Sequence, residues 1–171
     1  MPSRDTYELL ADLLRRLDDP GVRVLWLHGP AGAGKSAIMH TLCQRLQDTG
    51  RLGGSFFFKR GHPTRNNGRI LFATLAHQLG IFEPSLKCSI SRRVEANPTL
   101  VSDSIASQLR ELVVEPCRLA SGCGLRILII DGLDECAGVP VQQELLRCIA
   151  DIFCSHHALP GPANVPLQPL G

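Results

Sequence analysis

The chain has 171 residues, of which 44% are hydrophobic and 20% are charged, and its formal net charge is +2 at pH 7. This composition is typical of a globular domain with a core and excludes a disordered chain. The nearly balanced charge does not favour a nucleic-acid or membrane-surface partner. No apolar stretch approaches the roughly 18 residues that span a bilayer, and residues 1–5 lack the apolar core of a secretory signal.

The seven cysteines are odd in number, scattered, and without C-x-x-C spacing. This pattern predicts neither a disulfide framework nor a zinc site. Free cysteines on apolar helix faces behave as small hydrophobic residues. We therefore expect a reducing, cytoplasmic location.

The first predicted elements surround a glycine-rich segment. Leucines at helical spacing predict an amphipathic helix over residues 6–17, which ends at a turn. The apolar run over residues 22–27 is typical of a buried strand, and apolar residues after Ser36 recur at helical spacing. Between them stands Gly-Pro-Ala-Gly-Ala-Gly-Lys-Ser. A strand, a glycine-rich turn and a helix opening with Lys-Ser predict a phosphate-binding P-loop.

The residue types of this segment suit a nucleotide. Glycines permit positive φ and close backbone approach, so successive N–H groups can point at phosphate oxygens, and the helix start adds partial positive charge. Lys35 is expected to reach the β- and γ-phosphates, and the Ser36 hydroxyl to ligate Mg²⁺. A glycine-rich turn without a ligand would not need the Lys-Ser pair. The residues assigned to nucleotide binding are Gly29, Pro30, Ala31, Gly32, Ala33, Gly34, Lys35 and Ser36.

The middle of the chain is predicted to be a strand followed by helices. The sequence Ser-Phe-Phe-Phe over residues 55–58 is typical of a strand buried on both faces. Residues 59–69 form a basic loop that we expect to be solvated, although contact with phosphate or a partner stays open. Helices are predicted over residues 70–79, after Pro84, and over residues 105–113, where Pro116 ends the last one.

A second strand-like run, residues 125–130, ends in Asp-Gly-Leu-Asp-Glu. In open α/β sheets, ligands bind beyond the carboxyl ends of parallel strands. Asp131 is therefore predicted to hold Mg²⁺, directly or through water. Asp134 and Glu135 are candidate catalytic residues that would orient an attacking water. An Asp-Gly pair is also common in turns, but three carboxylates in five residues favour a metal site.

The end of the chain changes character. Pro140 is expected to start a final helix, and four prolines within residues 160–171 predict an irregular tail. The predicted fold class is α/β: a P-loop NTPase with a parallel sheet of three recognisable strands and helices on both faces. We expect an N-terminal helix and linker over residues 1–21, the NTPase core over residues 22–159, and the tail over residues 160–171.

With these motifs the chain resembles the NACHT class of P-loop signal-transduction ATPases, in particular fungal NOD-like receptor proteins with a nephrocystin 3-like N-terminal domain. The resemblance spans residues 6 to about 159. It implies that Ala37 extends the nucleotide-binding stretch, and that the cofactors are ATP or ADP with Mg²⁺. It also implies that Gly132 stands where many related ATPases carry a catalytic glutamate. Hydrolysis would then rely on Asp134 or Glu135, or be slow. The resemblance rests on residues 25–37, 55–60, 71–79 and 131–135.

The same resemblance implies a nucleotide-driven switch that gates oligomerisation and signalling in full-length relatives, with self-association or protein partners. It also implies a further apolar strand and a Ser-Arg-Pro-like sensor after residue 160. The proline-rich tail stands there instead, so we expect a truncated version with an incomplete sheet.

Two other functions stay open. A small-molecule kinase fits the length of the chain and would use Arg60, Arg65 and Arg69 as a lid, but the acidic tip fits a switch better. An inactive fragment or interaction piece is the other alternative, because an open sheet with unpaired strands is a liability.

Overall fold

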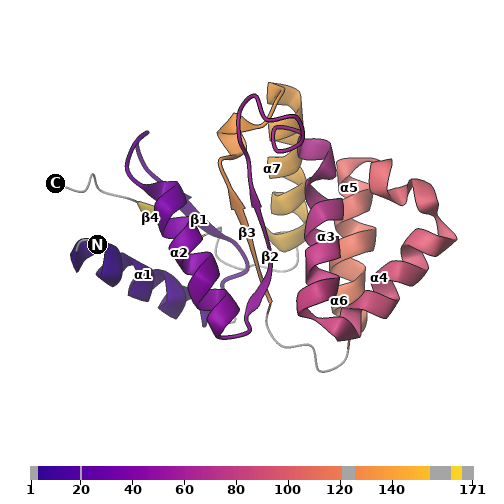
Figure 1. The fold of residues 1–171 in the computed structure, drawn as a ribbon, viewed down its shortest axis with the longest axis horizontal. Helices are drawn as coiled ribbons and strands as arrows, with labels where there is room; N and C mark the ends of the chain where they lie inside the picture. The colour runs from indigo at the N-terminus through magenta and orange to yellow at the C-terminus, as the bar shows by residue number, and fades with distance from the viewer. Residues whose placement is uncertain (1–3, 20, 121–125, 155–162, 167–171) are drawn as a thin grey trace. The chain divides into compact units, whose positions relative to one another are not determined.

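The computed structural model describes residues 4–19, 21–120, 126–154 and 163–166. Within these ranges the chain is a mixed α/β structure of mostly helices and short parallel strands (Figure 1). It divides into two compact units, one formed by residues 1–44 and 149–171 and the other by residues 45–148. Helix α2 spans Lys35–Asp48 and helix α7 spans Val139–Cys154.

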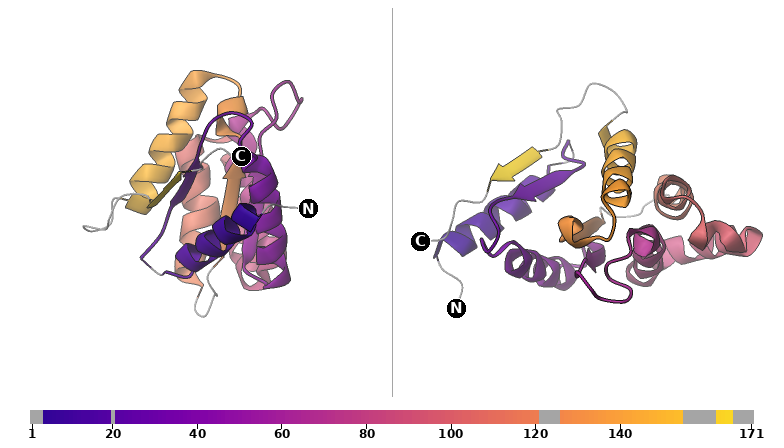
Figure 2. Two further views of the ribbon diagram at one scale, coloured as in Figure 1. Left: turned by 90° about the vertical axis from the view of Figure 1, so that its left-hand side faces the viewer. Right: turned by 90° about the horizontal axis from the view of Figure 1, so that it is seen from above.

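The first unit contains α1 (Arg4–Leu17), whose Leu10 and Leu13 are buried, as the leucine spacing predicts. Strand β1 (Leu25–His28) pairs in parallel with β4 (Ala163–Pro166), with Leu25 opposite Ala163 and His28 opposite Pro166. Figure 2 shows the two short strands side by side.

The prediction of an irregular tail is wrong for residues 163–166, which form strand β4. Proline is tolerated at a strand end or edge, where its missing N–H removes no ladder bond. In β4 the single proline, Pro166, is the last residue, and within the described strands β4 has a neighbour on one side only. The rest of the predicted tail lies outside the described residues.

The structure bears out the predicted parallel strands in part. The expected strands are present as β1, β2 (Leu52–Phe57) and β3 (Ile127–Asp131), and all pairing is parallel. Among the described residues, however, they form two two-stranded sheets, β1 with β4 and β2 with β3. Strand β1 therefore pairs with residues 163–166. The proline content of this segment alone did not predict a strand there.

Helix α3 (Leu71–Phe82) packs closely on β2 because β2 carries two glycines. A Cβ added at Gly53 would lie 3.1 Å from a methyl of Leu79. At Gly54 it would lie 3.3 Å from a methyl of Leu75. Both leucines are fully buried, so the glycines create the space that the leucine face of α3 fills.

The triple phenylalanine lies partly within β2, as predicted. Phe56 and Phe58 are buried with their rings in edge contact at 4.7 Å between centroids, whereas Phe57 is half-buried. Alternation along a strand places Phe57 on the opposite face. This arrangement is that of a strand covered on both faces.

The side-chain amide of Gln78, on α3, forms two hydrogen bonds with the backbone of β2, as a neighbouring strand would. Its Oε1 accepts the Ser55 N–H at 2.8 Å, and its Nε2 donates to the Ser55 carbonyl at 3.0 Å. Exposed strand edges with unpaired backbone groups invite unwanted pairing. Gln78 therefore satisfies the backbone N–H and carbonyl of Ser55 in β2.

A helical layer completes the second unit and corrects one prediction. Pro116 does not end the helix that begins at Ile105, because the chain continues as helix to Leu119. The six residues before α6 form a π-helical turn, in which hydrogen bonds span five residues rather than four. We infer that this wider turn accommodates the proline, which has no N–H to donate. The segments are α4 (Pro84–Ala96), α5 (Ile105–Gln108), the π-turn (Leu109–Val114) and α6 (Glu115–Leu119).

Gln108 is the buried polar side chain that ties this layer together, with 1% of its surface exposed. Its Nε2 donates to the carbonyls of Arg69 and Asp103, both at 3.0 Å. Its Oε1 accepts the Ala73 N–H at 3.3 Å. A buried amide with all these bonds made fixes one arrangement of three segments, because any displacement leaves polar groups unpaired.

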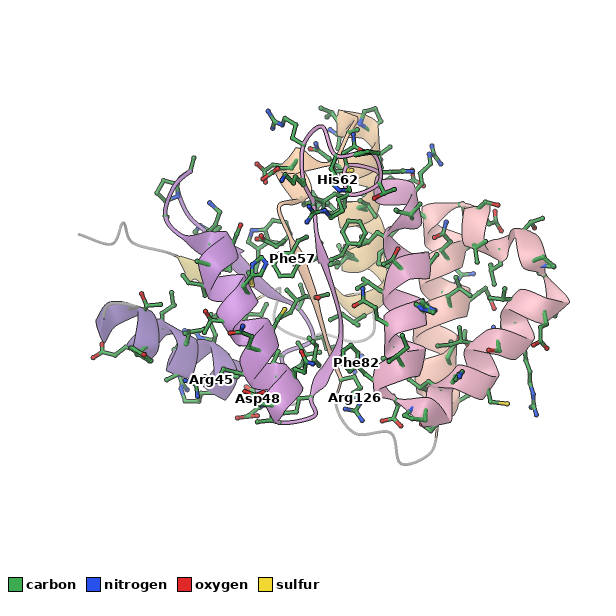
Figure 3. The ribbon with its side chains drawn as sticks, viewed as in Figure 1. Arg45, Asp48, Phe57, His62, Phe82 and Arg126 are labelled. Carbon is green, nitrogen blue, oxygen red and sulfur yellow. The ribbon has the colours of Figure 1, made fainter. Side chains whose placement is uncertain are left out.

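At the start of β3, Arg126 clamps two turns together. Its Nε donates to Glu83 Oε2 at 3.1 Å, and its Nη1 bonds the Gly50 carbonyl. Figure 3 shows Arg126 close to Phe82 at one end of β3, with His62 near the opposite end. The guanidinium of Arg126 lowers the pKa of the Glu83 carboxyl, and the hydroxyl of Ser85 adds to the effect.

This lowered pKa predicts a pH dependence of stability. A carboxyl with a depressed pKa contributes stability above its ordinary pKa, about 4.3 for glutamate, and loses it as the pH falls through the folded-state value. We expect the midpoint of thermal unfolding to fall more steeply between pH 6 and pH 3 in the wild type than in Glu83→Gln. Glu95→Gln, at an exposed position of α4, is the control. Equal slopes for the wild type and Glu83→Gln would contradict the role of this pair.

Candidate functional site

The glycine-rich loop lies between β1 and α2 in the first unit (Figure 1). Gly32 and Gly34 have φ of +80° and +77°, a region that residues with a side chain rarely adopt. A Cβ added at Gly32 would meet nothing within 4 Å. Backbone conformation rather than crowding therefore explains the glycine at this position.

Lys35 begins α2 and folds back over this loop. Its Nζ donates to the Gly29 carbonyl at 2.8 Å and to the Pro30 carbonyl at 2.9 Å. The ammonium group is thus held within the loop by two backbone oxygens. An anion entering the loop would meet this charge together with the N–H groups of the helix start.

The remaining predicted residues of this segment occupy different depths. Ala33 is buried, with its N–H donating to the Pro30 carbonyl at 3.3 Å. Ser36 is exposed in the first turn of α2, and its backbone carbonyl pairs with the ring of His40. The loop is therefore buried at Ala33 and exposed to solvent at most of its other residues. Pro30, Ala31, Gly32 and Ala37 are exposed, and Gly29 and Gly34 are half-buried.

The acidic turn lies in the second unit, at the end of β3. Asp131 is the last residue of that strand, and its carbonyl accepts the Phe58 N–H at 2.9 Å. Residues Leu133–Glu135 form a single 3₁₀ turn before α7. Asp131 is half-buried and Asp134 is exposed. The three carboxyl-bearing residues thus follow one another closely after the strand end, as the sequence predicts.

Gly132 explains why a small residue follows Asp131. Its backbone is left-handed, with φ +68° and ψ +34°. A Cβ at this position would also lie 3.3 Å from the Phe58 carbonyl oxygen. A glutamate here would be strained and crowded, so conformation bars a catalytic carboxylate from position 132.

Glu135 makes a contact that the sequence did not predict. Its Oε2 accepts the backbone N–H of Arg60 at 2.9 Å. The Arg60 side chain donates from Nη2 to the Asp134 carbonyl at 3.3 Å. The basic loop is therefore anchored to the acidic turn through its backbone, although Lys59, Arg60, Arg65 and Arg69 are exposed as expected.

A second anchor lies further along the same loop. The Asn66 carbonyl accepts the Ala137 N–H at 2.7 Å. Gly68 is buried so tightly that a Cβ would lie 2.8 Å from the Cys136 sulfur. Burial raises the pKa of the Cys136 thiol. The Asn-Asn-Gly turn signal could have indicated a tight turn here, but not its partner.

The predicted site residues therefore fall into two groups. The structure brings Asp131, Asp134 and Glu135 together in the second unit, whereas residues 29–37 belong to the first. Within the described residues, no set of three or more His, Cys, Asp and Glu side chains is arranged to hold a metal ion by protein groups alone. No helix in the described ranges is both long and apolar enough to span a bilayer.

One family model matches the chain. The family described as "Nephrocystin 3, N-terminal" matches residues 11–160, which is most of the chain. The chain therefore belongs to the nephrocystin 3 N-terminal domain family. No curated protein and no solved structure matches it.

Replacement of Gly132 tests the geometry of the acidic turn. Gly132→Ala adds the strain of a left-handed alanine, about 1–2 kcal/mol, and a contact with the Phe58 carbonyl. Gly50→Ala is a matched control, because Gly50 also has positive φ (+64°) but would meet nothing within 4 Å. We expect denaturant unfolding to give a larger loss of stability for Gly132→Ala than for Gly50→Ala. An equal or smaller loss would show that the turn relaxes freely.

Proposed function

We propose that the chain is a nucleotide-binding switch module of the NACHT type, which binds ATP or ADP with Mg²⁺ and hydrolyses ATP slowly or not at all. The observation that carries this proposal is the loop before α2. There, two glycines with positive φ and the Lys35 ammonium group surround the start of a helix. This combination of backbone donors, helix dipole and lysine suits a chain of phosphates.

The residues present fit a bound polyphosphate. The Lys35 ammonium rests on backbone carbonyls that phosphate oxygens would replace as partners. In this proposal the N–H donors come from Gly29, Ala31, Gly32 and Gly34, because Pro30 has no N–H and the Ala33 N–H already donates to the Pro30 carbonyl. Ala37 lies within the same first turn of α2. Adenine as the base rests on the family resemblance alone.

The residues proposed for magnesium are Ser36 and Asp131. The Ser36 hydroxyl is exposed on α2, and no hydrogen bond from the described residues reaches the Asp131 carboxylate. Oxygen ligands of this kind suit Mg²⁺, which usually keeps several waters. When bound, the ion would neutralise charge on the phosphates. The proposal requires residues 29–37 and the acidic turn to act on one nucleotide.

Slow hydrolysis follows from the chemistry of the acidic turn. Gly132 carries no carboxylate, so activation of water is left to Asp134 and Glu135. Without an arginine supplied by a partner, we propose a turnover on the order of the ~10⁻⁴ s⁻¹ of an unassisted GTPase. Such a rate suits a switch, whose state persists between signals.

The cellular setting is also part of the proposal. Among the cysteines whose side chains the structure describes, Cys88 and Cys136 are free thiols. Free thiols suit a reducing compartment, so we propose a cytoplasmic module. Its partners would be the nucleotide and, in longer relatives of the NACHT type, protein partners or further copies.

Replacement of Lys35 tests nucleotide binding. Lys35→Ala removes charge-assisted bonds worth roughly 1.5–3 kcal/mol, so we expect Mg·ATP to bind about 10–100-fold more weakly by titration calorimetry. Mg·ATP should also raise the thermal midpoint of the wild type. Lys87→Ala, at an exposed position of α4, is the control and should bind as the wild type does. Equal affinities for Lys35→Ala and the wild type would overturn the proposal and favour an interaction piece without nucleotide.

A further inference from the structure

The asparagine–glycine pair at residues 67 and 68 is a chemically labile point that the proposed function does not use. Asparagine is a thermolabile residue, because the backbone nitrogen of the next residue can attack its side-chain carbonyl carbon. The attack is least hindered where the next residue is glycine, which has no Cβ. Asn67 is the asparagine of this chain that precedes a glycine, since Asn66, Asn97 and Asn164 precede Asn, Pro and Val.

The attacking atom, the backbone nitrogen of Gly68, is enclosed in the structure. Gly68 is buried, and a Cβ added to it would lie 2.7 Å from a methyl of Val141 and 2.9 Å from a methyl of Leu145. A hydrogen bond from the Gly68 backbone N–H to the Cys136 sulfur partly offsets the raised pKa that burial gives this thiol. The nitrogen must lose its proton in order to attack, and both its burial and this bond oppose that loss.

The attacked group, the side chain of Asn67, is also held in place. Its Oδ1 accepts the Arg69 N–H at 3.0 Å, and its own backbone N–H donates to the Thr64 carbonyl at 3.0 Å. Asn67 is exposed, so water can reach it. Ring closure, however, requires the side chain to leave the Arg69 N–H and the peptide between Asn67 and Gly68 to rotate. Because Gly68 is tightly enclosed, that rotation requires the surrounding contacts to open first.

Two hydrogen bonds hold the loop over residues 59–68 against the acidic turn and so resist this opening. The Asn66 carbonyl accepts the Ala137 N–H at 2.7 Å, directly before the labile pair. At the other end of the loop, Glu135 Oε2 accepts the Arg60 N–H at 2.9 Å. All of these residues belong to the second unit. Transient breaking of the two bonds is a local opening of the kind that exposes buried backbone groups.

We propose that Asn67–Gly68 is a deamidation site that the folded junction between the loop over residues 59–68 and the acidic turn keeps unreactive. When the junction opens, the Gly68 nitrogen loses its proton and forms a bond to Cγ of Asn67. The Cγ–Nδ2 bond breaks, and the amide nitrogen leaves as ammonia with that proton. Water then opens the succinimide ring at either carbonyl, which gives aspartate or isoaspartate at residue 67. This modification does not depend on the proposed function.

The two products have different structural consequences. Aspartate keeps a side-chain oxygen that can accept the Arg69 N–H, as Oδ1 of Asn67 does. Isoaspartate instead lengthens the backbone by a carbon atom directly before Gly68, whose surroundings leave no room for added atoms. We therefore expect the isoaspartate form to be unable to close the junction again, so that the loop stays detached from the acidic turn.

The first test follows deamidation of the full chain at mildly alkaline pH by peptide mass spectrometry. Folded protein should convert Asn67 at least about tenfold more slowly than the same chain in denaturant, because reaction requires local opening. Asn66 is the internal control, since it lies in the same loop but precedes an asparagine, and it should react more slowly than Asn67 in denaturant. Equal rates at Asn67 in the folded and denatured chains, or faster reaction at Asn66, would overturn the proposal.

The second test removes one of the two bonds that hold the junction. Glu135→Ala should convert Asn67 about three- to tenfold faster than the wild type, the factor expected for loss of one hydrogen bond. Glu135→Gln keeps an oxygen acceptor, and Asp134→Ala leaves the Glu135 carboxylate in place, so both should react as the wild type does. Equal rates for Glu135→Ala and the wild type, or equal acceleration of Asn66 and Asn67, would contradict control by the junction.

The third test examines the modified protein itself. Ion exchange separates the converted forms, which carry an added negative charge. The Arg60 amide should be protected from hydrogen exchange in the wild type and in Asn67→Asp, which reproduces the aspartate product. It should exchange faster in the isoaspartate form. Equal protection in the isoaspartate form would show that the junction closes again and would overturn that part of the proposal.

Discussion

The parallel pairing of β2 with β3 is the interaction on which the second unit depends. Phe57 lies opposite Asp131, and the Phe58 N–H closes the ladder on the Asp131 carbonyl. Because both strands end at the same edge, the loop that follows β2 and the acidic turn that follows β3 start side by side. The left-handed Gly132 then turns the chain so that the Glu135 carboxylate meets the backbone of that loop.

Other side chains of this unit hold the start of β3, the backbone of β2 and the start of α3 in place. Arg126 links the start of β3 to the turns at Glu83 and Gly50. Gln78 satisfies the backbone of β2, and Gln108 fixes the start of α3 against the following helices. Each of these polar side chains makes at least two hydrogen bonds. The strand ends are therefore held by a hydrogen-bond network as well as by the short β-ladder.

Local patterns predicted much of this arrangement. The leucine face of α3, the strand ending at Asp131, the phenylalanine strand and the glycines before Lys35 all follow from residue type and spacing. The missed features are contacts between distant residues. Nothing near Arg60 indicates that its N–H meets Glu135, and nothing in the proline-rich segment indicates pairing of residues 163–166 with β1. The helix continues past Pro116 because a π-helical turn precedes it, and such a turn has no sequence signature of its own.

The central proposal, which the contacts within each unit leave to experiment, is that the glycine-rich loop and the acidic turn serve one nucleotide. A double-mutant cycle tests it most directly, with Mg·ATP affinity measured for the wild type, Lys35→Ala, Asp131→Asn and the double variant. Residues that share a ligand show coupling, commonly 0.5–3 kcal/mol, whereas independent sites add. We expect the loss in the double variant to differ from the sum of the single losses by about 1 kcal/mol or more. Strict additivity, or an Asp131→Asn variant that binds Mg·ATP as the wild type does, would contradict the account.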